Sequence, residues 1–567
     1  QLTIKADLIL LHAPSVFDFR QRDDVLFAYL SDSDSVNVTS IFEMYPLGFL
    51  SLQAHLQQHG IKVVIINLAS LMLQHSNLDI DRLLAHLEAP VFGLDLHWMA
   101  HCHGSIEVAQ RVKAIHPDSL VIFGGLSATY FADQLIQYPA IDLVVQGYDT
   151  LEPVRQLVQS VIDGSRNLAA IPNLVYRQPD KTVAKTGYTH QPSRKYNDAA
   201  IQWSFYRDAI SSPTVNRLIM TLPNSGCAHD CGWCGGSRSA FVQPTGTHRS
   251  LVYKDHKHIV AELASMADAA RQTSIYALQC YSEPPQRMYE YLDTIQDMGY
   301  KSVSFELYNL PDEKLTRRIA QATQAYVLLS PESHDQEISR LAGRGNYSMA
   351  QMEAWIEKAL DSGIAGVMVW FFIGMPRQTS ESVMETVNYC ERLIRRFPGR
   401  KVIPLLCPMV PFLDPGSRFY EKPEAHGYRI FFHDLEQYRQ AMVAPLWYQR
   451  LNYETDWLSR RQLQNVTYES ISRLVEIKGE LGMLPKSFTR GILMTIDETQ
   501  SLLAEIESVI QSGAQLTSDL RAQIHLYNQK ILATSSDQIV PIPRPIGSRW
   551  FDDMAVSQEI IKDCIIA

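Results

Sequence analysis

A regular alternation of short apolar runs and helical patterns over the first 150 residues constrains the fold more than any other feature of the sequence. Each run has the length and composition of a buried parallel strand. The runs lie at residues 7–12, 61–67, 91–97, 120–125 and 141–147. Between them, amphipathic segments recur, and in one of them Ile106, Ala109 and Val112 share a helix face. Five strands interleaved with helices predict a doubly wound, Rossmann-like parallel sheet of the α/β class.

A second series of apolar runs follows with a similar rhythm. These runs lie at residues 218–223, 274–281, 302–307, 325–331, 366–373 and 402–408. Helical patterns separate them, and the clearest one places Val383, Val387 and Cys390 on a single stripe. Six strand–helix units form an incomplete version of the eightfold barrel. The central region is therefore predicted to be a partial (β/α)6 barrel.

These patterns divide the chain into four regions. Residues 1–165 are predicted to form the Rossmann-like domain, 166–216 a linker with a hairpin, 217–411 the partial barrel and 412–567 a mainly helical domain. The last region is rich in aromatic residues, such as Tyr428, Tyr438, Trp447 and Tyr453. Aromatic residues at this density are more typical of a domain core than of a substrate site.

Three cysteines follow the first strand of the second series. Cys227, Cys231 and Cys234 have the spacing C-x-x-x-C-x-x-C on a short loop with nearby glycines, which allow the backbone to fold tightly over a metal cluster. Three thiolates leave one iron of a four-iron cluster free to bind another molecule. The alternatives are a zinc site completed by His229 or by a distant residue, and three unrelated thiols. Zinc sites usually show paired Cys-x-x-Cys units and a visible fourth ligand.

With Trp233 directly before the third cysteine, this spacing resembles the signature of the radical S-adenosylmethionine (SAM) superfamily. In that family the open iron of a 4Fe-4S cluster binds SAM, and one electron from the cluster splits SAM to a 5'-deoxyadenosyl radical. The resemblance implies that the three cysteines hold the cluster. It also implies that polar residues at the ends of other strands contact SAM.

The candidate SAM contacts are Trp233, Ser282, Glu283, Glu332, Arg344, Gly374 and Pro376. By family position, Glu283 would accept hydrogen bonds from the SAM ammonium, although the usual Gly-Gly-Glu is absent. Glu332 suits the ribose hydroxyls, and Arg344 suits the SAM carboxylate. The turn at Gly374 resembles the family's Gly-x-Pro-x-x-Thr turn, which places backbone against adenine. The alternative for Glu332 and Arg344 is an ordinary surface or helix-end pair.

The glycine turn at Gly124 and Gly125 follows the fourth strand of the first series, where doubly wound sheets bind ligands. The order of elements and this turn resemble the cobalamin-binding domain that precedes many radical SAM modules. The implied cobalamin contacts are Pro14, Ser15, His97, Trp98, Gly124, Gly125, Ser127, Thr129 and Gly147. The alternatives are a nucleotide-binding domain and a purely structural Rossmann-like domain.

One departure concerns the cobalt ligand. Cobalamin domains of the methionine-synthase kind ligate cobalt through the histidine of an Asp-x-His-x-x-Gly sequence after their first strand. Here Asp95 and His97 imitate this sequence, but the glycine is absent and the residues follow the third strand. We therefore expect cobalt without a protein histidine ligand, and His97 beside Trp98 is equally well explained as a hydrogen-bonded strand-end histidine.

Composition excludes several classes of protein. A formal net charge of -10 argues against a general nucleic-acid binder. Five of the eight cysteines are scattered singly, which is typical of reduced thiols in the cytoplasm. The longest uncharged run of the barrel region has 15 residues, which is short for a membrane span. The chain begins at Gln1 and not at Met, so the question of a lost targeting peptide stays open.

Together the two resemblances imply a cobalamin-dependent radical SAM methyltransferase, which transfers a methyl group from methylcobalamin to an unactivated carbon after the 5'-deoxyadenosyl radical has abstracted hydrogen. The implied cofactors are a 4Fe-4S cluster, SAM and cobalamin. The implied partners are a small-molecule or natural-product substrate, selected by the C-terminal domain, and an electron donor such as flavodoxin or ferredoxin. The alternatives are a cyclase or rearrangement enzyme without net methyl transfer, and a non-catalytic corrinoid or iron-sulfur carrier or sensor.

Overall fold

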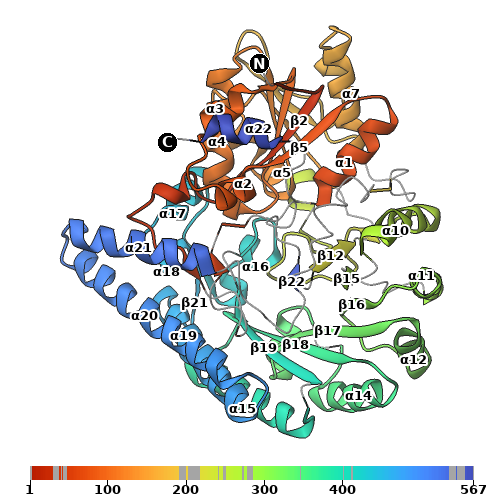
Figure 1. The fold of residues 1–567 in the computed structure, drawn as a ribbon, viewed down its shortest axis with the longest axis vertical. Helices are drawn as coiled ribbons and strands as arrows, with labels where there is room; N and C mark the ends of the chain where they lie inside the picture. Colours follow the sequence, from red (N-terminus) through yellow and green to blue (C-terminus); the bar gives the residue numbers. More distant parts are fainter. Residues whose placement is uncertain are drawn as a thin grey trace.

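Two seven-stranded sheets organise the computed structural model (Figure 1). The structure describes residues 3–29, 33, 38–39, 41–42, 47–190, 200–201, 217–221, 223–240, 242–246, 251–270, 274–277, 285–344, 346–399, 401–409, 413–534, 544–545 and 556–565. The first sheet belongs to the N-terminal part of the chain and the second to the central part. No helix in these ranges is both long enough and apolar enough to cross a membrane.

The first sheet has the strand order β11-β10-β9-β8-β7-β2-β5. Its strands are β2 (Leu8–His12), β5 (Val63–Asn67), β7 (Val91–Asp95), β8 (Leu120–Gly124), β9 (Leu143–Val145), β10 (Leu174–Arg177) and β11 (Val183–Lys185). The first five are parallel in the order 2-1-3-4-5, which confirms the predicted doubly wound, Rossmann-like sheet. The hairpin β10–β11 pairs antiparallel with β9, so the sheet continues into the segment interpreted as a linker.

Helices cover both faces of this sheet, and its strands are therefore almost wholly buried. The helices are α1 (Leu47–Gln58), α2 (Leu68–Gln74), α3 (Ile80–Ala85), α4 (Cys102–Ile115), α5 (Leu126–Tyr130), α6 (Ala132–Leu135) and α7 (Leu151–Ile162). α1 packs against α7 on one face, and α3 packs against α4 on the other (Figure 1).

The second sheet has the order β19-β18-β17-β16-β15-β12-β22, and all its strand pairs are parallel. Its strands are β12 (Arg217–Thr221), β15 (Ser274–Ala277), β16 (Ser302–Leu307), β17 (Gln324–Glu332), β18 (Gly366–Ile373), β19 (Val402–Pro408) and β22 (Arg544–Pro545). The helices of this region are α10 (His256–Ala270), α11 (Pro285–Asp297), α12 (Glu313–Ala322), α13 (Gln336–Leu341), α14 (Met349–Asp361) and α15 (Ser380–Arg396). The first six strands follow each other in space as in the chain, which confirms the partial (β/α)6 barrel.

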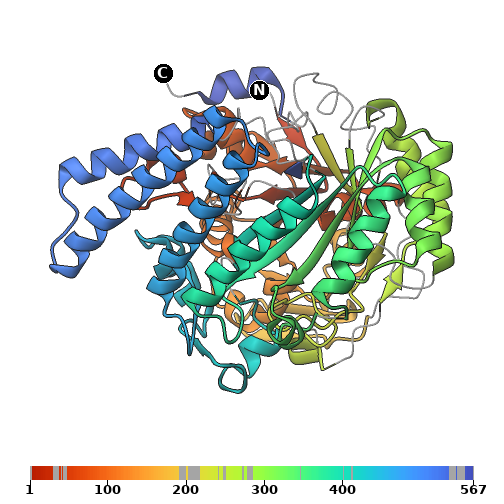
Figure 2. The same ribbon diagram turned by 90° about the horizontal axis from the view of Figure 1, so that it is seen from below.

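The region after the barrel is mainly helical, as predicted. Its helices are α16 (Arg418–Glu421), α17 (Leu435–Met442), α18 (Trp447–Arg450), α19 (Arg460–Glu480), α20 (Lys486–Gln511), α21 (Ser518–Thr534) and α22 (Gln558–Cys564). Figure 2 shows the blue helices α19 to α21 on the opposite side of the barrel from the yellow-green α10 and α11. Tyr428, Tyr438, Trp447 and Tyr453 are buried, which agrees with their interpretation as core.

Short strands complete the fold. β1 (Ile4–Lys5) pairs with β6 (Leu87–Glu88), β3 (Ala28–Tyr29) with β4 (Val38–Thr39), β13 (Asn224–Ser225) with β14 (Val252–Tyr253), and β20 (Tyr428–Ile430) with β21 (Tyr453–Thr455). The short helix α9 (Val242–Thr245) lies between β13 and β14 in the chain. α22 returns to the first domain, where the N–H of Asp79 donates to the carbonyl of Cys564 at 2.8 Å (Figure 1).

Candidate active site

The loop that carries Cys227, Cys231 and Cys234 begins directly after β13. Gly226 turns the chain with a left-handed φ of +93°, and the side chain of Asn224 donates to its carbonyl at 3.0 Å. Two backbone N–H groups then point at thiols. The N–H of His229 lies 3.4 Å from Cys227 Sγ, and the N–H of Gly236 lies 3.3 Å from Cys234 Sγ. Such bonds favour thiolates, the form that binds iron.

Two distant segments hold this cysteine loop. The N–H of Gly232 donates to the carbonyl of Ala342 after α13 at 2.8 Å, and its carbonyl accepts the N–H of Phe419 on α16 at 2.8 Å. Gly343 adopts φ +91°, and a Cβ there would lie 2.6 Å from the carbonyl oxygen of Asp230. The loop therefore lies tightly between the barrel and the segment that follows it.

Cys231 is buried, and Cys227 and Cys234 are partly buried. Burial raises the pKa of Cys231 to about 12 and that of Cys234 well above its ordinary value. A bound metal ion deprotonates such thiols outright. Within the described residues, no three His, Cys, Asp or Glu side chains converge on a single ion; in a four-iron cluster each thiolate binds a different iron.

Glu332 and Arg344 form a buried ion pair beside the cysteine loop. Arg344 Nε donates to Glu332 Oε1 at 3.0 Å, and the two side chains are 7% and 0% exposed. Glu332 ends β17 with a left-handed φ of +68°, a conformation that a non-glycine residue keeps only where the surroundings impose it. Burial raises the pKa of Glu332 to about 7, and Arg344 opposes this shift. The surface-pair interpretation of these two residues is wrong.

One polar atom of each member of this pair lacks a partner. Glu332 Oε2 and Arg344 Nη1 are buried and make no hydrogen bond within the described residues. A buried polar atom without a partner costs about 1–3 kcal/mol. A ligand that donates to the carboxylate and accepts from the guanidinium would remove this cost. Ribose hydroxyls and a carboxylate, both present in SAM, have the required chemistry.

Tyr308 is a residue of this site that the sequence analysis did not identify. It directly follows β16, and its ring lies 3.9 Å from the guanidinium carbon of Arg344. The ring of His229 packs edge-on against the same tyrosine, at a centroid distance of 4.8 Å. Tyr308 therefore holds Arg344 beside the cysteine loop through a cation–π contact. Its position at the carboxyl end of a barrel strand is the signal that could have identified it.

The backbone groups of the turn after β18 bond to other protein residues. Gly374 has φ +102°, and a Cβ there would lie 2.4 Å from Tyr453 Oη. The N–H of Gly374 donates to Gln378 Oε1 at 2.8 Å, and its carbonyl accepts from Tyr428 Oη at 2.8 Å. Pro376 is buried in the same turn. Thr379 caps the next helix, α15.

The remaining SAM candidates lie in two places. The ring of Trp233 lies 5.5 Å from that of Phe372, and its Nε1 is buried without a partner within the described residues. Ser282 and Glu283, predicted to follow the second barrel strand, lie outside the described residues.

The glycine turn of the first sheet lies at the carboxyl end of β8. Gly125 has φ +118°, and a Cβ there would lie 2.7 Å from the carbonyl oxygen of Leu96 and the nitrogen of His97. This glycine is thus required by the neighbouring strand end. At Gly124 a Cβ would meet only the carbonyl oxygen of Val145, at 4.0 Å. Gly124 therefore leaves open space at the sheet edge where a ligand can approach the backbone.

The hydroxyls near this turn bond to the chain. Ser127 Oγ donates to the carbonyl of His97 at 3.0 Å. Thr129 Oγ1 donates to the carbonyl of Gly125 at 2.8 Å and accepts the N–H of Gly147 at 3.0 Å. Thr129 and Gly147 therefore shape the turn.

Pro14 and Ser15 lie deeper in the first domain. Both are buried, and the carbonyl of Ser15 accepts the N–H of Gly104 at 3.0 Å. A Cβ on Gly104 would lie 1.7 Å from the carbonyl oxygen of Pro14, so α4 packs directly on this segment.

Asp95 contacts a histidine of another strand. His12 Nδ1 lies 2.9 Å from Asp95 Oδ1, and both side chains are buried. His101 joins this cluster, with its ring 4.8 Å from that of His12 and its Nδ1 bonded to the carbonyl of Ala13 at 3.0 Å. The cluster lies between β2 and β7, where the strand order reverses.

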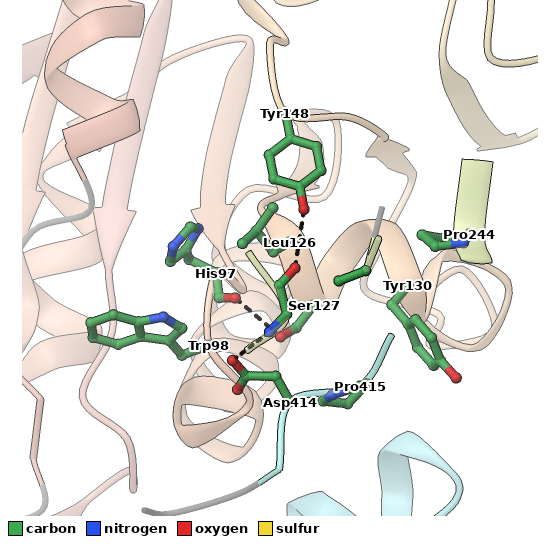
Figure 3. Close-up of a pocket in the computed structure, with 11 residues that line it drawn as sticks. His97, Trp98, Leu126, Ser127, Tyr130, Tyr148, Pro244, Asp414 and Pro415 are labelled. Carbon is green, nitrogen blue, oxygen red and sulfur yellow. Dashed lines mark hydrogen bonds between the residues drawn. The ribbon is translucent and has the colours of Figure 1, made fainter. Parts of the chain in front are cut away.

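A pocket lies between the edge of the first sheet and the cysteine loop (Figure 3). About 370 Å³ between its walls is free of protein atoms, and this space includes open solvent. Its walls are His97, Trp98, Leu126, Ser127, Tyr130 and Tyr148 from the first domain, and Gly235, Ala240, Pro244, Asp414 and Pro415 from the other side. Trp98 is 42% exposed here, although tryptophan is a largely apolar residue. An apolar ring at this edge and the open backbone at Gly124 suit a large flat ligand such as a corrin.

The pocket wall next to Cys234 is held from both sides. Tyr148 Oη of the first domain donates to the carbonyl of Gly235 at 3.0 Å. The N–H of Gly235 donates to Asp414 Oδ2 at 2.9 Å. The first domain is therefore bonded directly to the residue that follows the third cysteine.

Two family models match the chain. The B12 binding domain model matches residues 34–154, and the Radical SAM superfamily model matches residues 221–390, which include the three cysteines. No curated protein sequence matches the chain with significance.

Solved structures share the fold at low identity. The radical S-adenosylmethionine methyltransferase TsrM from Kitasatospora setae, with cobalamin and a [4Fe-4S] cluster bound, is 16% identical, with 76% of this chain and 81% of that chain covered and a TM-score of 0.51. The cobalamin-dependent S-adenosylmethionine radical enzyme OxsB with aqua-cobalamin bound is 10% identical, with 99% and 84% covered and a TM-score of 0.52. Its apo form is 12% identical, with the same coverage and a TM-score of 0.54.

Proposed function

The chain belongs to the cobalamin-dependent radical SAM enzymes, since a B12 binding domain precedes a radical SAM domain in it, and we propose that it is a methyltransferase acting on an unactivated carbon of a small molecule. The proposed cofactors are a 4Fe-4S cluster, SAM and cobalamin. When bound, the cluster and SAM supply a 5'-deoxyadenosyl radical and cobalamin supplies a methyl group.

The residues have distinct proposed roles. Cys227, Cys231 and Cys234 hold the cluster. Glu332 and Arg344 bind SAM through the two buried atoms that lack protein partners. His97, Trp98, Ser127 and the backbone at Gly124 form the surface against which cobalamin binds.

One observation carries this proposal: the pocket has one wall at the edge of the first sheet and the other at the loop of Cys234. A methyl acceptor must meet the radical and the methyl group in one place, and this pocket borders both proposed cofactor sites. The bond from Tyr148 to Gly235 fixes the distance between the two walls, and such positioning contributes strongly to catalysis. The apolar wall residues Leu126, Pro244 and Pro415 limit the contact of water with the reacting groups.

Methyl-labelled SAM tests the proposal. The anaerobic enzyme is reconstituted with iron, sulfide and cobalamin, reduced with flavodoxin or ferredoxin as the proposed electron donor, and incubated with cell extract as the source of substrate. We expect the label in a new product together with 5'-deoxyadenosine. The same protein with Cys234→Ala is the control and forms neither.

Two other outcomes favour the alternatives. A new product without label, formed together with 5'-deoxyadenosine, would favour a cyclase or rearrangement enzyme. Absence of 5'-deoxyadenosine from the reduced, fully reconstituted protein would favour a carrier or sensor. Either result would contradict the methyltransferase proposal.

A further inference from the structure

The pocket between the first sheet and the cysteine loop holds a single carboxylate, that of Asp414. Asp414 follows β19, the last strand of the barrel, and its N–H donates to the carbonyl of Trp233 at 3.2 Å. Its Oδ2 accepts the N–H of Gly235 at 2.9 Å. These two bonds fix the side chain against the cysteine loop. Its other oxygen, Oδ1, makes no hydrogen bond within the described residues. Figure 3 shows the carboxylate extending from the chain near Pro415 toward the wall that carries Ser127.

This carboxylate has no cationic partner in the pocket. No lysine or arginine is present among the described residues that form the pocket walls. Burial raises the pKa of Asp414 to about 6, and only the N–H of Gly235 opposes the shift. A partly buried carboxylate that lacks a cation, such as that of Asp414, is stabilised when a cationic ligand binds beside it.

The other walls offer little further hydrogen bonding to a ligand. Tyr148 Oη is bonded to the carbonyl of Gly235, Tyr130 Oη to Glu421 at 2.6 Å, and Ser127 Oγ to the carbonyl of His97. The tyrosine rings and the exposed ring of Trp98 therefore present mainly apolar surface. Aromatic faces of this kind attract cations as well as apolar groups.

We propose that Asp414 is the specificity-determining residue of the pocket, and that it binds the ammonium group of an amine substrate whose apolar body lies against the rings of Tyr130 and Tyr148. This inference rests on the proposed function and names its substrate class. The acceptor must lie between the two cofactors, and Asp414 stands on the cluster side of the pocket. An amine held there places its carbon skeleton toward the first sheet.

Binding of three related probes tests this inference without turnover. The probes are 2-phenylethylamine, the neutral 2-phenylethanol and the anionic phenylacetate, each measured by anaerobic equilibrium dialysis against the full chain loaded with cluster, cobalamin and SAM. We expect the amine to bind at least about 10-fold more tightly than either of the others, as for a hydrogen bond to a charged group. Equal or weaker binding of the amine would overturn the inference.

Asp414→Asn then removes the charge and keeps an oxygen for the N–H of Gly235. We expect the amine to lose about 10-fold in affinity and 2-phenylethanol to lose almost none. Glu421→Gln is the matched control, because this carboxylate contacts Tyr130 but does not form the pocket wall. Unchanged amine affinity in Asp414→Asn would contradict the inference.

Cofactor content distinguishes a second role for Asp414. Iron, cobalamin and SAM are quantified in Asp414→Asn, and we expect wild-type amounts of all three. Loss of cobalamin would instead assign the carboxylate to the amide groups of that cofactor and overturn the substrate role. Because binding is measured without reaction, these results stand whether or not methyl transfer is observed. Labelled product with unchanged amine binding in Asp414→Asn would overturn this inference alone.

Discussion

The carboxyl ends of the two parallel sheets differ in how their buried polar groups are satisfied. At the edge of the first sheet, the side chains of His12, Asp95 and Thr129 bond to one another or to the backbone. At the barrel mouth, four buried atoms lack a partner within the described residues. They are Glu332 Oε2, Arg344 Nη1, His229 Nε2 and Trp233 Nε1.

This difference indicates two modes of recognition. A site whose own polar groups are already bonded gains little from a ligand's hydrogen bonds, so the first sheet favours a ligand through shape, backbone and apolar contact. The barrel mouth gains stability only when a polar ligand arrives. A corrin suits the first site, and the charged and hydroxylated SAM suits the second.

The cysteines should produce the largest effect. Replacing Cys227, Cys231 and Cys234 together by Ala should remove all cluster iron and all SAM cleavage, while cobalamin still binds to the first domain. Iron analysis, electron paramagnetic resonance and the cobalamin absorption spectrum measure this. Cys390→Ala, which removes a buried thiol of α15, is the control and should keep the cluster. A four-iron cluster retained in the triple variant would contradict the site.

The glycine turn should give the next largest effect. Gly125→Ala should lower the free energy of unfolding by about 2–4 kcal/mol. The added Cβ would overlap the backbone of Leu96, and the alanine would have to adopt a φ of +118°. Gly124→Ala has no such conflict and should leave stability within about 0.5 kcal/mol. If cobalamin approaches the backbone there, Gly124→Ala should still weaken cobalamin binding. Thermal unfolding and cobalamin titration separate the two results, and equal stability of both variants would refute this account of the turn.

A substitution at the barrel mouth should change the affinity for SAM, whereas binding at the first sheet should stay the same. Arg344→Gln should weaken SAM binding about 10- to 100-fold, because a charged hydrogen bond to the carboxylate is lost. Cobalamin affinity should not change. Arg377→Gln is the control, since that arginine is exposed and pairs with Glu337 on the surface. Equilibrium dialysis with labelled SAM measures the SAM affinity of both variants. A parallel loss of cobalamin affinity in Arg344→Gln would remove the distinction between the two sheet edges.

Acid should destabilise the first sheet by a smaller amount. Burial lowers the pKa of His101 to about 4, so the unfolded chain binds more protons between this value and about 6.5. Stability is therefore complete above about pH 6.5 and falls as the pH approaches 4. Between pH 7 and 5.5 we expect a loss of about 1 kcal/mol.

The pH effect can be assigned with His101→Asn. The asparagine amide can still donate to the carbonyl of Ala13, but it does not titrate. The variant should lose about 1 kcal/mol of the pH dependence seen in denaturant unfolding of the first domain. An unchanged slope would show that other groups, such as His103, carry the acid sensitivity.

Sequence patterns predicted both sheets, because strand length and helix periodicity are local properties. They also placed Cys227 and Glu332 at strand ends, where barrel chemistry collects. The roles of Tyr148 and Asp414 were not predicted, since each acts by contacting Gly235 from a segment far away in the sequence. Local patterns carry no information about such contacts.

The sequence also did not show which partners the polar groups at the sheet edge bond to. Thr129 and Gly147 were expected to face cobalamin, and they stand at the predicted strand ends, but they bond to each other. Gly125 was expected to admit a ligand, whereas its Cβ position is filled by the neighbouring strand end. A sequence indicates which residues gather at a sheet edge, but packing decides which of them are free for a ligand.

The return of α22 to the first domain has a consequence for biosynthesis. Arg82 on α3 and His86 directly after this helix bond to Asp563 at 3.2 and 2.8 Å, and the N–H of Asp79 donates to the carbonyl of Cys564. The ribosome makes the first domain early, but α22 emerges only after the whole barrel. The surface of α3 therefore stays uncovered until the barrel has been synthesised. Completion of the domain that is proposed to carry cobalamin is thereby coupled to synthesis of the barrel that follows it.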